Sequence, residues 1–373
     1  MAEKNVLIIG GGAAGMAAAR TLSKSGAKAH IVEKNDSLGG HAIGYTCKAT
    51  DRCLQCGACS VEILLRDVEA DPNIQTHCSS VISKVEEKKG FTVTLAGAGQ
   101  QEGKAAATET LSVDAIIVAS GFAAFDAGIK STYGYGKFPN VISGLDMERI
   151  KREKGALLRP SDNKEAQKIA FIQCVGSRDE RLGNLWCSRV CCAYALRSAK
   201  SIKHKNPDAE ITVFYMDIQS FGKEFPVFYE SCQEDLRFVR MIPVDAFPAE
   251  DDKLSIRFLD DQGVMAAENE DDETDTAEEG ASAGAPAAVY DTFDLLVLSV
   301  GITPNPDNAA LAEMMGLSLD SDGFFTLSDE LNATATSKAG IFVAGTAQQP
   351  KTIEASIAQA DQAASEALKY LGE

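Results

Sequence analysis

The residues best suited to chemistry in this sequence of 373 residues are its ten cysteines. Four of them, Cys174, Cys187, Cys191 and Cys192, surround one predicted strand-to-helix junction, where Cys174 follows the strand 168–173 and the Cys191–Cys192 pair opens a helix. Cys187 and Cys191 would share a helical face if both were helical. Four thiolates suit an iron–sulfur cluster or zinc. The alternative is four small buried apolar side chains, which explains adjacent cysteines poorly.

A second cysteine group has the C-x₂-C-x₂-C spacing of bacterial ferredoxins: Cys53, Cys56 and Cys59. This short spacing lets three thiolates face one iron–sulfur cube. The fourth ligand must come from elsewhere, and the candidates are Cys47 and Cys78. We favour Cys47 because it lies in the same loop, whereas Cys78 enters a predicted strand. A site with three ligands, or a vacant one, is the alternative.

A dinucleotide-binding motif stands at the start of the chain. Gly10, Gly12 and Gly15 form G-x-G-x-x-G between an apolar strand, Val6-Leu-Ile-Ile9, and an alanine-rich helix. The first glycine permits a tight turn, the second lets a pyrophosphate approach the backbone, and the third lets helix and strand pack closely. Glu33 ends the next strand, where it would accept hydrogen bonds from ribose hydroxyls. A simple tight turn is the alternative, but it leaves the complete βαβ pattern unexplained.

Three further segments favour FAD as the dinucleotide. Leu38-Gly39-Gly40 follows the acidic residue, Ala119-Ser-Gly121 resembles the second signature of flavoproteins with two dinucleotide-binding domains, and Gly340-Ile-Phe-Val-Ala-Gly-Thr346 resembles the third. The third signature usually carries Asp where Thr346 stands. A helix after Pro350 would direct its N-terminus at the flavin. Outside the glycine triplet and Glu33, the positions predicted to bind FAD are Lys34, Gly39, Gly40, Ser120, Gly121, Gly345 and Thr346.

The middle of the chain repeats the βαβ pattern without the glycine motif. Its strands cover 168–173 and 211–216, and its helix covers 191–204. This is where a reductase with two dinucleotide-binding domains would bind NAD(P)H. The cysteines Cys174 to Cys192 occupy the corresponding turn, which predicts a degenerate NAD(P)H-like domain that carries a cluster site.

Two similar segments, 114–121 and 294–301, predict that the chain crosses twice between two domains. We expect an α/β fold with a discontinuous FAD-binding domain, 1–125 and 301–373, and a second domain, 126–300. Residues 266–288 are acidic, rich in Ala, Gly and Ser, and lack the apolar side chains needed to order themselves. They predict a disordered surface loop within the second domain.

The composition excludes several classes of partner. With 36 Lys and Arg against 54 Asp and Glu, the net charge of −18 disfavours nucleic acid and anionic membranes. The apolar runs are strand-sized, so we expect no direct membrane insertion. The first residues lack the features of a signal peptide, which predicts a cytoplasmic protein with reduced thiols. The four histidines show no ligand spacing, no residue grouping indicates hydrolysis, and Cys232 is predicted to pack in the core.

Four motifs together resemble the A subunit of heterodisulfide reductase and its relatives: Gln173-Cys-Val-Gly-Ser-Arg-Asp179, Cys187-Ser-Arg-Val-Cys-Cys192, Phe214-Tyr-Met-Asp217 and Tyr133-Gly-Tyr-Gly136. The resemblance runs from about Lys4 to Leu371. It implies a thioredoxin reductase-like fold with FAD. It also implies that the cysteines at 174, 187, 191 and 192 bind a non-standard [4Fe-4S] cluster.

The resemblance is to the short form of the family, because this chain lacks the added ferredoxin modules of the long members. Short members belong to a membrane complex that links quinone to adenylylsulfate reductase and to a sulfur-oxidising complex. The implied function is an electron-transfer subunit that relays electrons between FAD, one or two [4Fe-4S] clusters and partner subunits. A homodimer is a further expectation, since small flavoproteins of this fold often dimerise. The alternatives are a self-sufficient NAD(P)H-dependent flavoprotein reductase and a zinc scaffold that holds FAD.

Overall fold

The computed structural model describes residues 4–98, 109–259, 288–329 and 331–372. The chain divides into two compact units: the first contains 1–47, 55–124 and 302–373, and the second contains 48–54 and 125–301. The acidic loop predicted at 266–288 lies outside the described residues except for its last position, which begins a strand.

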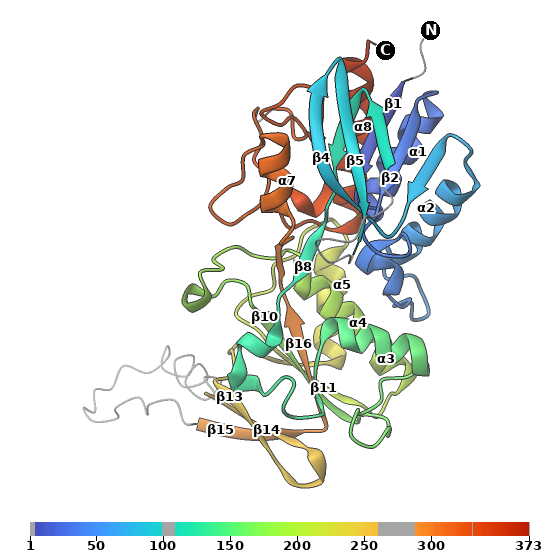
Figure 1. The fold of residues 1–373 in the computed structure, drawn as a ribbon. Helices are drawn as coiled ribbons and strands as arrows, with labels where there is room; N and C mark the ends of the chain where they lie inside the picture. The colour runs from blue at the N-terminus through green and yellow to red at the C-terminus, as the bar shows by residue number, and fades with distance from the viewer. Residues whose placement is uncertain (1–3, 99–108, 260–287, 330, 373) are drawn as a thin grey trace, which may run out of the picture. The chain divides into compact units, whose positions relative to one another are not determined.

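The first unit is built on a five-stranded parallel sheet in the order β18-β7-β1-β2-β3 (Figure 1). Its strands are β1 (Asn5–Ile9), β2 (Lys28–Val32), β3 (Ile74–His77), β7 (Ala115–Val118) and β18 (Ile341–Val343). The apolar run of β1 is buried on both faces, because Val6 and Ile8 enter one core and Leu7 and Ile9 enter the other. This is the pattern expected of a central parallel strand.

Helices cover one face of this sheet and a smaller sheet covers the other. The helices α1 (Ala13–Lys24), α2 (Ala58–Ala70) and α8 (Ile353–Tyr370) share the core of Val6 and Ile8. Alanines let α1 and α8 pack closely, and Figure 1 shows the two helices beside β1. The second core lies under the antiparallel strands β4 (Ser80–Lys88), β5 (Gly90–Gly97) and β6 (Glu109–Val113) and the helix α7 (Asn308–Met315). A short ladder joins β8 (Phe122–Ala124) to β17 (Ile302–Pro304).

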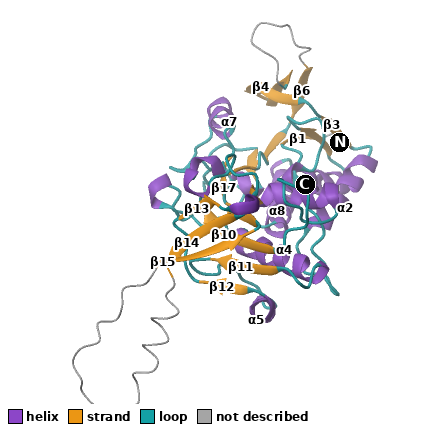
Figure 2. Ribbon diagram, turned by 90° about the horizontal axis from the view of Figure 1, so that it is seen from below, coloured by secondary structure: helices purple, strands orange, loops and turns teal. Residues whose placement is uncertain are grey.

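The second unit has its own five-stranded parallel sheet, in the order β12-β11-β10-β16-β9. Its strands are β9 (Val141–Ser143), β10 (Lys168–Val175), β11 (Glu210–Phe214), β12 (Arg237–Val239) and β16 (Leu295–Val300). Figure 2 shows β10, β11 and β12 side by side. One face packs in a core with the helices α3 (Gly144–Lys154), α4 (Cys191–Lys205) and α5 (Phe225–Asp235).

The opposite face of that sheet packs on a small antiparallel sheet. Its strands are β13 (Asp245–Pro248), β14 (Leu254–Leu259) and β15 (Ala288–Phe293). Phe214 of β11 meets Phe258 and Phe293 edge-on, with ring centroids 5.0 and 6.0 Å apart. The six short 3₁₀ helices of the described residues are Gly40–Gly44, Ala127–Ile129, Ser131–Tyr133, Glu180–Leu182, Glu250–Asp252 and Gly345–Ala347.

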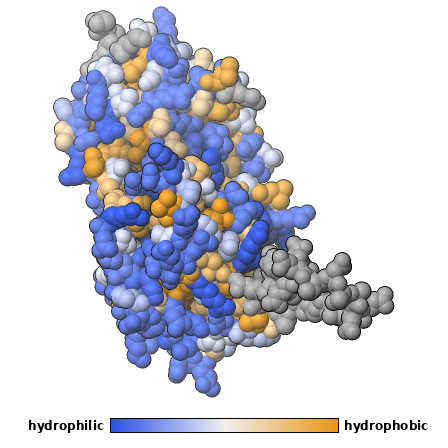
Figure 3. All heavy atoms as spheres, turned by 180° about the vertical axis from the view of Figure 1, so that it is seen from behind, coloured by the Kyte–Doolittle hydropathy of each residue, from blue (hydrophilic) through white to orange (hydrophobic). Residues whose placement is uncertain are grey.

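The surface is predominantly polar. Figure 3 shows hydrophilic residues over most of the face seen from behind, with apolar residues between them in small groups. Across the described parts of the chain, no helix has both the length and the hydrophobicity needed to cross a bilayer.

Candidate functional site

The glycine motif forms the turn between β1 and α1. Gly10 has φ +107°, and a Cβ added there would lie 2.3 Å from the carbonyl oxygen of Ala119. A Cβ on Gly15 would lie 1.9 Å from the carbonyl oxygen of Gly10. Gly12 differs, because a Cβ there would meet no described atom within 4 Å. Packing therefore requires glycine at 10 and 15, whereas Gly12 leaves open space at the helix start, as a pyrophosphate needs.

Glu33 is buried beside this turn. One carboxylate oxygen accepts the backbone N–H of Gly11 at 2.8 Å, and the other accepts the backbone and side-chain N–H groups of Asn35 at 2.9 and 2.7 Å. A carboxylate can accept about four hydrogen bonds, so capacity remains for a ribose hydroxyl. Lys34 instead forms an exposed ion pair with Asp307 at 2.7 Å.

The other predicted FAD-binding segments reach the same turn. The N–H of Gly39 donates to the carbonyl of Gly11 at 2.8 Å, and a Cβ on Gly40 would lie 3.2 Å from Gly12. A Cβ on Gly345 would lie 2.8 Å from the Cβ of Ala14. Segments separated by more than 300 residues in sequence thus meet at the carboxyl edge of the first sheet, where α/β folds bind their ligands.

Some residues that hold these segments were not expected from the sequence. Ser120 donates to the side chain of Asn308 at 2.8 Å, and Asn305 donates to the carbonyl of Ser120 at 2.6 Å. Gln359 of α8 accepts the N–H of Gly345 at 2.9 Å. Polar residues within a small-residue helix or a loop carry no periodic signal, so the sequence alone did not single them out. Gly121 follows β7 with φ +78°, and a Cβ there would meet no described atom within 4 Å; Thr346 lies in the 3₁₀ helix Gly345–Ala347 after β18.

In the second unit, a bulge in β10 positions the first cysteine. The register with β16 shifts between Ile172 and Val175, and Cys174 has φ +57°. α4 begins at Cys191, so Cys187 lies in the preceding loop and the two do not share a helical face. The thiol of Cys191 donates to the carbonyl of Val300 at 3.7 Å.

The electrostatics of these thiols show that they are neighbours. Burial, together with the nearby Cys192 and Cys187 and against the effect of Arg178, raises the pKa of Cys174 to about 11. Burial also raises the pKa of Cys191 and of Cys192, again with contributions from the other thiols. The raised pKa values of Cys174, Cys191 and Cys192 favour neutral thiols in the absence of a cation, and a positively charged iron centre would favour the thiolate forms that ligate it. Four neighbouring cysteines fit the donor set of an iron–sulfur cluster. Within the described ranges, no group of three or more His, Cys, Asp or Glu side chains is arranged to hold a single metal ion.

Arg178 and Asp217 border this cysteine group. Arg178 forms a two-pronged ion pair with Asp217, with one N–H···O distance of 3.0 Å. The thiol of Cys192 donates weakly to the backbone carbonyl of Asp217 at 3.9 Å. The guanidinium lowers the pKa of the Asp217 carboxyl. Both residues come from motifs on which the family resemblance rests.

The Cys53–Cys59 group falls where the chain passes between units. Cys53 belongs to the second unit, whereas Cys47, Cys56 and Cys59 belong to the first. α2 begins directly after Gly57, whose φ is +75°, so Cys59 lies in its first turn. Cys78 is partly buried against the first core, and burial together with nearby Glu33 and Asp36 raises its pKa.

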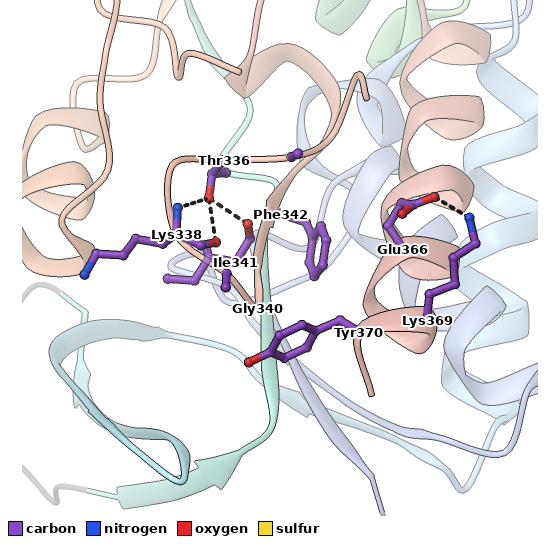
Figure 4. A pocket seen from close by; sticks show the side chains of 10 residues that line it. Thr336, Lys338, Gly340, Ile341, Phe342, Glu366, Lys369 and Tyr370 are labelled. Atoms are coloured by element: carbon purple, nitrogen blue, oxygen red, sulfur yellow. Dashed lines mark hydrogen bonds and ion pairs between the residues drawn. The ribbon is translucent and has the colours of Figure 1, made fainter. Parts of the chain in front are cut away.

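One pocket of the structure lies away from the glycine motif. A pocket of about 300 Å³ lies in the first unit between the start of β18 and the end of α8 (Figure 4). Its Thr336 hydroxyl donates to the carbonyl of Ile341 at 2.7 Å, and Lys369 pairs with Glu366 at 2.6 Å. It is at the amino end of β18, whereas the glycine motif is at the carboxyl edge, so we assign it no role in binding FAD.

Comparison with known proteins identifies the class first. The family model described as pyridine nucleotide-disulphide oxidoreductase matches residues 4–170. Thioredoxin reductase of T. acidophilum has the same fold, with a TM-score of 0.61 and 13% identity over 98% of this chain and 99% of that one. The enzyme of Lactococcus lactis gives 0.60 and 16%, covering 99% of both chains. The protein therefore has the fold of the thioredoxin reductase-like flavoproteins with two dinucleotide-binding domains, as predicted.

The sequence relatives define the family more narrowly. The iron-sulfur A subunit of the CoB–CoM heterodisulfide reductase of Methanocaldococcus jannaschii is 33% identical over 97% of this chain and 64% of its own length. The A subunit of the H₂:CoB-CoM heterodisulfide,ferredoxin reductase of Methanothermobacter marburgensis is 32% identical over 98% of this chain and 63% of its own length. The chain belongs to the family of heterodisulfide reductase A subunits, a family of oxidoreductase subunits, and spans slightly less than two thirds of these relatives.

Proposed function

We propose that this chain is an electron-transfer subunit of a heterodisulfide reductase-like complex, with FAD in the first unit and a [4Fe-4S] cluster in the second. The observation that carries the proposal is the group of mutually interacting thiols at the β10–α4 turn, where an NAD(P)H-binding domain would have its glycine motif. When bound, FAD can exchange electrons in pairs or singly, and the cluster exchanges them one at a time.

The protein's own contribution is to hold and insulate these groups. The open backbone at Gly12, the free N–H groups at the start of α1 and the remaining acceptor capacity of Glu33 suit the FAD pyrophosphate and ribose. Cys174, Cys187, Cys191 and Cys192 are the proposed cluster ligands. Gly10, Gly15, Lys34, Gly39, Gly40, Ser120, Gly121, Gly345 and Thr346 complete the proposed FAD site, with Lys34 the weakest member because it pairs with Asp307.

A second [4Fe-4S] cluster is proposed at Cys53, Cys56 and Cys59. Cys47 remains the favoured fourth ligand, since Cys78 packs against the first core. The ferredoxin-like spacing of the triplet supports this site. Two clusters would provide the chain with one point of electron entry and one of exit.

The proposed partners are the other subunits of such a complex, because the relatives are named as subunits of heterodisulfide reductases. A cytoplasmic location, with contact to a membrane only through a partner subunit, and a homodimeric state remain expectations from the sequence. Transfer of electrons to a heterodisulfide is not proposed for this chain alone.

Iron, zinc, acid-labile sulfide and FAD should be quantified in anaerobically purified protein. About eight irons per FAD would support both clusters, and about four would support one. Zinc with essentially no iron would refute the electron-relay function and favour a scaffold. The Cys232→Ala variant is the matched control, because Cys232 is a buried thiol outside both cysteine groups and should retain all the iron.

A further inference from the structure

A buried amide lies directly beside the proposed cluster ligands. Gln173 precedes Cys174 in β10 and is only 1% exposed. Neither its side-chain nitrogen nor its side-chain oxygen has a hydrogen-bond partner among the described residues. Burying an amide without partners is costly, and native proteins rarely leave both of its atoms unsatisfied. The amide therefore requires a partner that the polypeptide does not supply as it stands.

The strand pattern places Gln173 on the same face as α4. Ile169 and Phe171 enter the core that also contains Ala195 and Leu196 of α4. Successive odd-numbered positions of β10 share one face, so Gln173 is the next residue on it. In a βαβ unit the helix begins at the carboxyl end of the preceding strand, and α4 begins with Cys191 and Cys192.

A second unpaired group lies opposite the bulge on the neighbouring strand. Ile172 pairs with Leu298 and Val175 with Val300, so Gln173 and Cys174 together lie opposite the single residue Ser299. Ser299 is fully buried, and its hydroxyl also has no partner in the described chain. The Cys191 thiol contacts the carbonyl of the next residue, Val300. The bulge thus gathers one amide, one hydroxyl and the ligand cysteines at one end of the sheet.

We propose that the side-chain N–H of Gln173 donates a hydrogen bond to a sulfur atom of the cluster held by Cys174, Cys187, Cys191 and Cys192, and so raises its reduction potential. The Ser299 hydroxyl and the Gln173 amide oxygen are not bonded to each other in the structure; in the proposed arrangement a change of side-chain rotamer lets Ser299, a positioning residue, donate to that oxygen and direct the N–H group at the cluster. This arrangement satisfies all three orphaned atoms. A donor to a cluster sulfur stabilises the more negative, reduced cluster. The inference rests on the proposed function.

The test is a redox titration of the cluster in Gln173→Leu, followed by electron paramagnetic resonance. The relevant signal is the one that Cys191→Ala abolishes. We expect iron and sulfide per FAD to stay at the wild-type level. We expect the midpoint potential to fall by about 59 mV, which is a tenfold change in the one-electron reduction equilibrium. The flavin potential should not move.

Ser299→Ala provides a milder variant in case leucine at 173 prevents cluster retention. It should shift the potential in the same direction by less, and adding it to Gln173→Leu should have no further effect. Ser201→Ala is the matched control, because Ser201 is also fully buried with an unpaired hydroxyl but lies ten residues after Cys191, about 15 Å along α4. If both Gln173→Leu and Ser299→Ala retain the cluster and its midpoint potential is unchanged, this inference is overturned and the proposed function is not affected. Wild-type protein without iron would instead overturn the proposed function.

Discussion

Cys191 and Cys232 are both buried thiols of the second unit, yet their surroundings differ in chemistry. Cys191 is next to Cys192 and interacts electrostatically with three other thiols. Cys232 lies in the apolar core with Leu236 and Phe228, and burial raises its pKa to about 12. A buried thiol among apolar side chains behaves as a small hydrophobic residue, whereas a buried thiol among thiols is suited to ligation.

Replacing Cys191 with alanine should therefore remove one cluster and leave FAD bound. We expect a loss of about four irons per FAD, because one cubane contains four. The absorption spectrum and iron analysis measure both cofactors in one sample. The Cys232→Ala variant, measured in the same way, is the control and should keep both cofactors. Simultaneous loss of FAD and iron, or retention of both, would contradict the ligand assignment.

The thiol of Cys232 should make the protein less stable in alkali. Its pKa rises from 9.0 to about 12 on folding, so its contribution is complete below pH 9. Between pH 9 and 12 the unfolded chain loses the proton first, and the free energy of unfolding falls by at most about 1.4 kcal/mol per pH unit. Urea unfolding from pH 8 to 10.5 should show a steeper decline in wild type than in Cys232→Ala. Equal slopes would exclude this effect.

At the scale of elements, the β1–α1 turn separates two roles that glycine plays. Gly15 is enclosed by the backbone of Gly10, whereas Gly12 borders open space. Gly15 allows the helix and the strand to pack closely, and Gly12 allows a ligand to approach the backbone. The same spacing motif therefore contains residues that should respond differently to one added methyl group.

Gly12→Ala should weaken FAD binding without destabilising the FAD-free protein. Its φ of −76° is accessible to alanine, and nothing in the described protein clashes with the added methyl. Gly15→Ala should lower the free energy of unfolding of the FAD-free protein by about 1–3 kcal/mol, because the backbone must move. FAD titration and urea unfolding of the two apoproteins separate the effects. A Gly12→Ala variant as unstable as Gly15→Ala would show that the turn is not open.

At the scale of the whole molecule, each unit repeats the same parallel βαβ plan, but the chemistry of the strand-to-helix turn differs. In the first unit the turn is glycine-rich. In the second it follows the β10 bulge that carries Cys174, starts at Gly176 and ends at the cysteine pair that opens α4. A nicotinamide dinucleotide needs the close backbone approach that the glycine motif provides. The fold class alone thus does not assign the second unit a nucleotide.

NADH and NADPH should consequently fail to bleach the flavin within minutes, whereas dithionite should bleach it completely. Anaerobic stopped-flow absorbance at the flavin band measures this. A thioredoxin reductase, mixed with the same nucleotide under the same conditions, is the positive control that the nucleotide can reduce a flavin. Rapid bleaching by either nucleotide would favour the self-sufficient reductase.

Much of the fold and the family could be predicted from the sequence because its strongest signals are local. Each of these signals involves residues that are close together in the sequence: the apolar strand Val6–Ile9, the glycine spacing that follows it and the cysteine spacing at 187–192. Hydrophobic periodicity and backbone sterics act over that range. The thioredoxin reductase-like fold and the heterodisulfide reductase family were confirmed, while the individual site residues and domain limits stay predictions.

Tertiary structure decided what depends on segments far apart in the chain. It places Gly345 against Ala14, pairs Lys34 with Asp307, and sets Gln173 and Cys174 opposite Ser299. It also begins α4 at Cys191, which leaves Cys187 in a loop. Hydrogen-bond partners and strand register follow from how distant segments pack. The sequence around a polar residue such as Gln173 therefore does not indicate whether its side chain will find a hydrogen-bond partner. The sequence by itself therefore determined the local motifs and the family, and packing determined which side chains share a site.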